Sequence, residues 1–269
     1  MLMLSIFTAI LAPAADASGK FEAPQGEVVV VTQALGQALR VLESADSSDI
    51  DKSRAVADAM EIANNRLPRQ SFVAQLLASA TADNLEDVIR EAYGMLSFVP
   101  VHESDLPEGA PTFTPVGVIE LKQYPKVRKA VAGGFFTLFS HIKKNKIAMT
   151  APVQMDYELS DSGRLKQKNM AFFYSSTNIG KTGRDGRVEV VEVEPVTVLS
   201  TGVSGRRNNE VIRDRIDRLQ SWIADHEDYE LAGPIRLMGY NSPFVPAAKQ
   251  FYEVQIPVRE VAATVTASP

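Results

Sequence analysis

The second half of the chain repeats one order of secondary-structure elements, and this repetition limits the folds open to it. Runs rich in β-branched residues alternate with two amphipathic stretches, which predicts strand, strand, helix, strand, strand, and then the same series again. We expect the first series over 117–123, 126–132, 134–144, 152–157 and 170–175. We expect the second series over 188–193, 196–203, 208–225, 235–240 and 250–257.

A duplicated ββαββ unit of this kind predicts the α+β class. Two helices would cover one face of a mostly antiparallel sheet of about eight strands, and a strongly twisted sheet of that size tends to curl toward a distorted barrel. The concave apolar surface under the helices would then be a natural pocket for a small molecule.

Residues 27–98, ahead of this unit, predict a small all-α region of three or four helices. Glycine is scarce there, and one face of the first helix would bury Val31, Ala34, Leu35, Ala38, Leu39 and Leu42. Ser48 or Asp49 would cap the second helix. Pro68 would lie in the first turn of the third helix, and Asn84 would open the fourth. This region would pack on the rest of the chain or, alternatively, bind a protein partner.

The composition changes between these regions, and we place a linker at 99–113. Prolines, a glycine and acidic residues there disfavour both helical and strand hydrogen bonding. The β-rich domain would cover 114–259, and 260–269 would form a disordered tail.

Residues 1–17 resemble a secretory signal peptide. An apolar run to Ala12 is followed by small residues, and Ala15 and Ala17 match a small-x-small cleavage site. The run is shorter than the roughly 20 apolar residues that a membrane span requires. We therefore expect export to the periplasm or the extracellular space, with a cytoplasmic location if this segment is not a signal peptide.

Composition excludes several classes of partner and chemistry. The net charge of −5 provides no basic surface for nucleic acid. The chain has no cysteine, which rules out disulfides, thiolate metal sites and covalent haem attachment.

Four sequence elements resemble those of the SOUL haem-binding family. Residues 146–153, Lys-Ile-Ala-Met-Thr-Ala-Pro-Val, follow a helix that carries Phe135, Phe136 and Phe139, as in the central motif of that family. The family's entry strand, its Tyr-Asn-Pro-Pro-Phe element and its final strand are similar to 121–125, 239–244 and 251–254 respectively.

The resemblance implies a barrel of duplicated halves that binds haem or protoporphyrin non-covalently in an apolar cleft beside the first helix of the domain. Phe135, Leu138, Phe139 and Ile142 share one face of that helix and are expected to be core. Phe136 lies off this face and is the candidate wall of the ligand site. Met149 would contact the porphyrin or ligate its iron, and the alternative is that Met149 fills the core.

Imidazole ligands for iron are few, because the chain has only three histidines. His102 falls in the linker. His141 lies off the apolar face of its helix, at the flank or in solvent. His226 lies within the apolar arc of the second helix of the domain, in its last turn, where capping is the alternative role. His141 and His226 are therefore the candidate metal ligands.

Two basic residues are candidates to bind the porphyrin propionates, since arginine and lysine both pair with carboxylates. Lys146 follows the first helix of the domain and Arg206 precedes the second. The alternatives are complementation of a helix dipole for the lysine and a plain loop position for the arginine.

We thus expect a non-enzymatic protein that binds a tetrapyrrole for carriage, buffering or scavenging. No phosphate loop, zinc pair or nucleophile elbow is present in the sequence. A second hypothesis is a GyrI-like small-molecule-binding domain, some of which hydrolyse their ligands, and a buried glutamate and tyrosine in the cleft would favour it. A third is a scaffold whose N-terminal helices recruit a protein.

Overall fold

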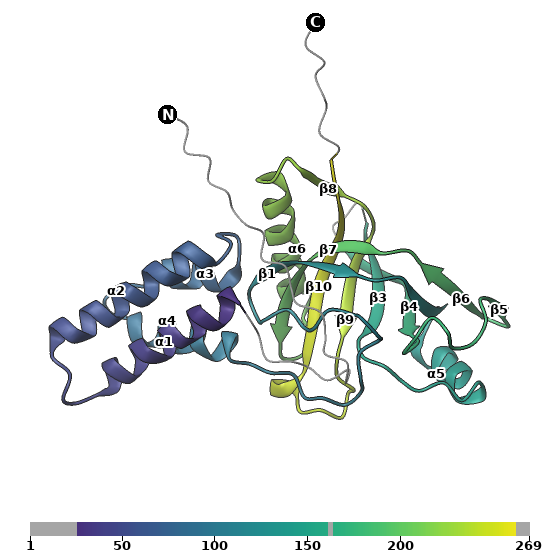
Figure 1. Cartoon of the computed structure of the whole chain (residues 1–269), viewed down its shortest axis with the longest axis horizontal. Coiled ribbons are helices and arrows are strands. Elements are labelled where there is room, and N and C mark those ends of the chain that lie inside the picture. Colours follow the sequence, from purple (N-terminus) through teal and green to yellow (C-terminus); the bar gives the residue numbers. More distant parts are fainter. Residues whose placement is uncertain (1–25, 161–163, 262–269) are drawn as a thin grey trace, which may run out of the picture.

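The computed structural model describes residues 26–160 and 164–261 (Figure 1). A bundle of four helices is followed by a twisted sheet with two helices of its own. The expected signal peptide at 1–17 lies outside the described residues. Among the described helices, none combines the length and the apolar character that crossing a membrane requires.

The N-terminal region has the expected helices. They are α1 (Glu27–Glu43), α2 (Asp49–Arg66), α3 (Phe72–Ala78) and α4 (Leu85–Leu96). Four of the six residues expected on the buried face of α1 are buried, while Ala34 and Leu42 pack at the margin of the same core. Ser48 caps α2 in a capping box with Asp51.

The expectation for Pro68 was wrong. Helix α3 begins at Phe72, four residues later, and Pro68 lies outside it. The carbonyl of Pro68 accepts a hydrogen bond from the Ser71 amide at 2.9 Å, which closes a turn ahead of the helix. Pro68 thus lies in the turn that precedes α3 and not in the first turn of the helix.

The sheet has ten strands, two more than expected. They are β1 (Ile119–Tyr124), β2 (Val127–Ala132), β3 (Val153–Leu159), β4 (Leu165–Phe173), β5 (Gly183–Asp185), β6 (Val188–Val193), β7 (Val196–Ser204), β8 (Tyr229–Leu231), β9 (Ile235–Gly239) and β10 (Phe251–Glu260). The helices of the domain are α5 (Phe135–Lys144) and α6 (Asn209–Ala224), and a 3-10 turn spans Ala247–Lys249. The additional strands, β5 and β8, are three residues long.

The strand order shows how the two ββαββ copies combine. The path runs β1-β7-β10-β9-β3-β4-β2-β6-β5, with β8 beside β10 and antiparallel ladders throughout. The first strand of each copy pairs with the second strand of the other copy, β1 with β7 and β6 with β2. The third strands of the two copies, β3 and β9, also pair with each other. The α+β class is confirmed, and in the described residues no ladder joins β1 to β5, so the sheet is open.

Both helices of the domain lie on one face of the sheet. Leu138 and Ile142 of α5 pack over β2, β4 and β6, whereas the apolar side of α6 packs over β7 and β10. Val153 and Met155, on the same side of β3, contact the cores under α5 and α6 respectively. The opposite side of the sheet, which we call the helix-free face, carries Met238 and Phe251.

The segment 99–113, expected to be a linker, contains no helix or strand but packs closely on the domain. Leu106, Ala110 and Phe113 are buried in the core of the helix-free face. The carbonyl of Asp105 accepts a hydrogen bond from the amide of Ala151 at 3.0 Å. This segment therefore covers part of the helix-free face.

The helical region docks on the domain through α3. The guanidinium of Arg215 on α6 lies 4.1 Å from the ring centre of Phe72. Ser71 Oγ accepts a hydrogen bond from the Ile119 amide at 3.0 Å. Gly117 has φ +75° and lies against Val73, so a side chain at this position would be both strained and crowded. A disordered tail was expected over 260–269. Glu260 is instead the last residue of β10, and 262–269 lie outside the described residues.

Candidate functional site

A band of polar side chains crosses the helix-free face. In β10, Tyr252 and Val254 point toward α6, so alternation directs Glu253 and Gln255 to the other side. In β1, Ile119 and Leu121 likewise face α6. The polar residues buried on the helix-free face are Glu120, Lys122, Gln154, Ser200, Arg236, Glu253 and Gln255.

Glu253 is the centre of one part of this band. Its Oε1 accepts hydrogen bonds from Lys122 Nζ at 2.6 Å, Thr114 N at 2.6 Å and Tyr240 OH at 3.1 Å. Its Oε2 accepts from Gln255 Nε2 at 2.7 Å and Ser200 Oγ at 3.3 Å. Five donors thus saturate this carboxylate, which is fully buried.

Burial controls the ionisation of the groups around Glu253. Lys122 and Glu253 are both 0% exposed, and they form a buried ion pair. Burial raises the pKa of the Glu120 carboxyl to about 7, with Lys122 opposing the shift and Glu253 adding to it. Burial also raises the pKa of Tyr240 well above its usual value. The ion pair needs its partners, because a lone charge at this depth would be costly.

The other part of the band lies where β2, β3 and β9 cross the middle of the sheet. Lys129 Nζ donates a hydrogen bond to Gln154 Oε1 at 3.1 Å, and Gln154 Nε2 donates to Asp156 Oδ1 at 2.6 Å. Arg236 stands opposite Asp156 in the ladder between β9 and β3. Lys129 and Asp156 are half-buried, so this part of the face is open to solvent.

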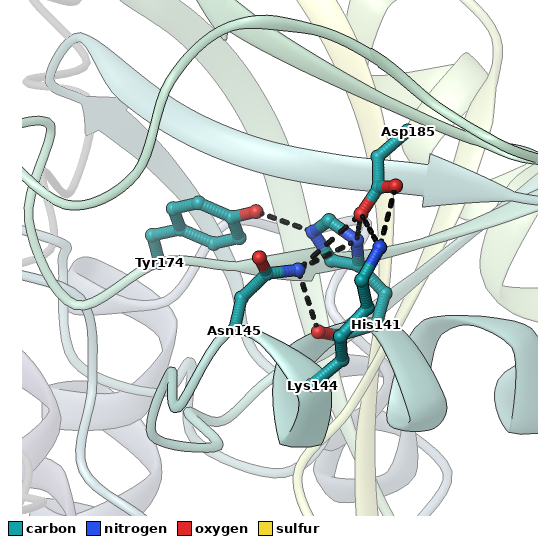
Figure 2. A network of polar contacts seen from close by, with 5 residues as sticks. All are labelled: His141, Lys144, Asn145, Tyr174 and Asp185. Atoms are coloured by element: carbon teal, nitrogen blue, oxygen red, sulfur yellow. Dashed lines mark hydrogen bonds and ion pairs between the residues drawn. The ribbon is translucent and has the colours of Figure 1, made fainter.

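His141 was expected at the flank of its helix or in solvent, and the structure corrects this. It is 7% exposed, and Figure 2 shows its ring between two partners. Its Nδ1 lies 3.0 Å from Asp185 Oδ2, and its Nε2 lies 2.8 Å from Tyr174 OH. Lys144 and Asn145 hold the same carboxylate (Figure 2) and lower the pKa of Asp185. Both ring nitrogens are engaged, so His141 as placed has none free for iron.

The aromatic face of α5 also differs from expectation. Leu138 and Ile142 are core, but Phe135 is 39% exposed and Phe139 is 37% exposed. Phe136, the candidate ligand wall, is 83% exposed. The Phe135 ring stacks on that of Phe139 with centroids 5.8 Å apart and meets the Phe172 ring edge-on at 5.1 Å. We call Phe135, Phe136 and Phe139 the α5 aromatic patch.

The remaining candidates do not gather at one site. Arg206 precedes α6 and is exposed, whereas His226 follows it, about 24 Å away for a helix of this length. His226 stacks on Trp222 with ring centroids 3.7 Å apart, and its Nδ1 lies 2.6 Å from the Trp222 carbonyl. Met149 packs against the core under α5.

Lys146 is exposed and lies just beyond the end of α5, with φ 54°. It is therefore nearer to the α5 aromatic patch along the chain than Arg206 or His226 is. In the described residues, no cluster of three or more metal-binding side chains is found.

Comparison with known families provides the decisive observation. Residues 113–257 match the model of the SOUL heme-binding protein family. The chain belongs to the SOUL family. The four elements that resemble this family all lie within the matched residues, and three of them supply Lys122, Tyr240 and Glu253 to the buried polar band.

Solved structures with a similar arrangement share little sequence with this SOUL domain. The EcmrR C-terminal domain is 16% identical, with 53% of this chain and 98% of that chain covered and a TM-score of 0.41. An EcmrR–DNA complex is 14% identical, with 87% and 81% covered and a TM-score of 0.42. A hydrolase from Listeria innocua is 12% identical, with 52% and 91% covered and a TM-score of 0.39. No curated protein matches the chain.

Sequence reasoning missed the buried polar band, although a signal for it exists. Glu253 and Gln255 interrupt an otherwise apolar strand at alternate positions, as Glu120 and Lys122 do in β1. Charges at period two within buried strands indicate a second, polar face. Their pairing requires the β1–β7–β10 order, which no local pattern encodes.

Proposed function

We propose that this SOUL domain binds a tetrapyrrole non-covalently on the α5 aromatic patch, for carriage or buffering. The observation that carries the proposal is the exposure of three phenylalanine rings on one helix of a SOUL domain. Fully burying one such side chain contributes about 1.5–3 kcal/mol, so rings left in water favour a ligand with a large apolar face.

The surroundings of the patch suit a porphyrin with acidic side chains. Lys143 Nζ lies 5.4 Å from the centre of the Phe139 ring. An ammonium there can pair with a propionate at the edge of a porphyrin that stacks on the rings. Lys146, just beyond the end of α5, is a second cation for this role.

The residues around the α5 aromatic patch suit the porphyrin ring and its propionates better than they suit the iron. The imidazole on α5 is committed to Tyr174 and Asp185. The other candidate, His226, lies at the end of α6, a helix that covers a different part of the sheet from α5. Binding on this account depends on apolar contact and propionate pairing and tolerates the loss of iron.

Titration of the full chain with haem and with iron-free protoporphyrin tests the proposal. We expect saturable one-to-one binding of both, measured by the porphyrin absorption band and by Trp222 fluorescence. Phe136→Ala should weaken binding by about 10-fold or more, because it removes an aromatic contact worth at least about 1.4 kcal/mol. Ile50→Ala, which truncates an exposed apolar residue on α2, is the matched control and should bind as wild type does. Absence of saturable binding, or equal binding by Phe136→Ala, would contradict the proposal.

The hydrolytic alternative required a buried glutamate and tyrosine in the cleft. Glu253 and Tyr240 are a buried, hydrogen-bonded pair, but they lie on the helix-free face and not under the helices. Their geometry also favours a structural role. The carboxylate already accepts five hydrogen bonds and neutralises Lys122, so it has no lone pair available as a base.

A further inference from the structure

Arg236 is a buried cation that has no direct partner among the residues the structure describes. Its residue exposure is 8%, and it lies on the helix-free face between Ile235 and Leu237, which face α6. Among the described residues, none forms a hydrogen bond or an ion pair with its guanidinium. Burial lowers its pKa, whereas Tyr124 and Asp156 act at longer range to raise it.

Lys129 brings a second positive charge to the same place. Burial and the charge of Arg236 lower the pKa of Lys129 to about 8, although Asp156 acts in the opposite direction. The lysine donates to the neutral amide of Gln154, at 3.1 Å, and not to a carboxylate. Two cations that repel each other in a partly buried site are unfavourable unless an anion joins them.

On the same face, the protein neutralises another buried cation with one of its own carboxylates. Lys122 is paired with Glu253 at 2.6 Å. Within the described part of the chain, Asp156 is the carboxylate that acts on both Arg236 and Lys129. It accepts a hydrogen bond from Gln154 Nε2 at 2.6 Å. Arg236, Lys129 and Asp156 together therefore carry a charge of +1, and one further negative charge would neutralise them.

The side chains around Arg236 also indicate which kind of ligand would bind there. An arginine with free N–H groups binds a carboxylate through two parallel hydrogen bonds. Apolar neighbours stand beside the cations, since the Phe173 ring centre lies 6.0 Å from Lys129 Nζ and Met238 is opposite Gln154 in the sheet. A carboxylate attached to a small apolar body suits these surroundings.

We propose that Arg236 and Lys129 form a binding site for the carboxylate of a small organic acid on the helix-free face. This site is separate from the proposed tetrapyrrole site, because α5 covers the opposite face of the sheet. Arg236 would hold the carboxylate through two of its N–H groups, and Lys129 would add a second positive charge.

Titration of the full chain with benzoate, followed by two-dimensional amide NMR, tests this site. We expect saturable shifts that centre on β2, β3 and β9. Arg236→Gln should weaken benzoate binding by about 10- to 100-fold, since a charge-assisted hydrogen bond is worth about 1.5–3 kcal/mol. Lys129→Gln should weaken it as well, by a smaller factor.

Two controls separate this site from general attraction to positive charge. Benzamide has the shape of benzoate without its charge and should give no saturable shift. Arg259→Gln changes an exposed arginine at the end of β10 and should leave benzoate binding unchanged. No saturable shift with benzoate, equal binding of benzamide, or unchanged binding in both Arg236→Gln and Lys129→Gln would overturn the proposal. None of these results depends on whether a tetrapyrrole binds.

Discussion

At the scale of single residues, the Lys122–Glu253 pair shows how this domain tolerates charge inside its sheet. Neither side chain is exposed, and Glu253 is fully hydrogen-bonded. The cost of burying such a pair is repaid only while both partners are present.

Removal of either partner should therefore be strongly destabilising. We expect Lys122→Met and Glu253→Gln each to lower the free energy of unfolding by about 3–5 kcal/mol, and the double variant to lose less than the sum. Urea denaturation measures all three. Lys126→Met, which removes a lysine paired with Glu192 and Glu194 at the surface, is the control and should have little effect. Additive losses in the double variant would show that the pair is not coupled.

The raised pKa of Glu120 predicts a pH dependence of stability. Unfolded, this carboxyl ionises near 4.5, but folded it keeps its proton to about pH 7. The folded state thus binds more protons between these values, so the stability contributed by Glu120 falls as pH rises from about 4.5 to 7.

Replacement by glutamine should remove this dependence. We expect the free energy of unfolding of Glu120→Gln, relative to wild type, to rise between pH 5 and pH 8 by an amount on the order of 3 kcal/mol. Urea denaturation across that range is the measurement. Parallel profiles for the two proteins would mean that Glu120 ionises normally in the folded state.

At the scale of elements, the two ends of helix α5 differ. Side-chain hydrogen bonds hold one end in place, and aromatic rings are exposed at the other. Its C-terminal end is tied through His141 to Tyr174 and to Asp185 of β5 (Figure 2). Its N-terminal end carries the aromatic patch. On our proposal, His141 fixes the position of the helix and the phenylalanines contact the ligand.

A His141→Ala variant distinguishes these roles. Loss of the ring leaves Tyr174 OH buried without this partner, so we expect a loss of roughly 1–3 kcal/mol in the free energy of unfolding. Affinity for iron-free protoporphyrin and the haem absorption band should both stay close to wild type in the folded variant. A haem band that changes while stability does not would make His141 the iron ligand and contradict our assignment.

The sequence predicts the strands and helices of this fold better than it predicts which of them lie side by side. The eight main strands and both helices of the domain follow from period-two and helical patterns. Strands β5 and β8 are too short to show a period. They are defined by their pairing, β5 with β6 and β8 with β10. The burial of His141 was missed for a similar reason. Its partners come from β5 and from Tyr174, the residue just after β4, which the periodicity of α5 cannot reveal.

At the scale of the whole molecule, the sheet separates two regions of different chemistry. One face carries α5 and α6, with aromatic rings exposed on α5. The helix-free face carries a buried polar band, partly covered by the segment 99–113. The family motifs predicted the domain and its fold, but the division between the faces depends on cross-copy strand pairing that is visible only in three dimensions.

The central claim is that the α5 aromatic patch is where this SOUL domain meets a tetrapyrrole. Amide hydrogen exchange of the full chain, with and without iron-free protoporphyrin, tests it most directly. We predict slower exchange in α5 (Phe135–Lys144) and in the residues just after it, with no change in α1 (Glu27–Glu43) or β10 (Phe251–Glu260). Protection confined to the N-terminal helices or to the strands of the helix-free face, with α5 unchanged, would contradict the account.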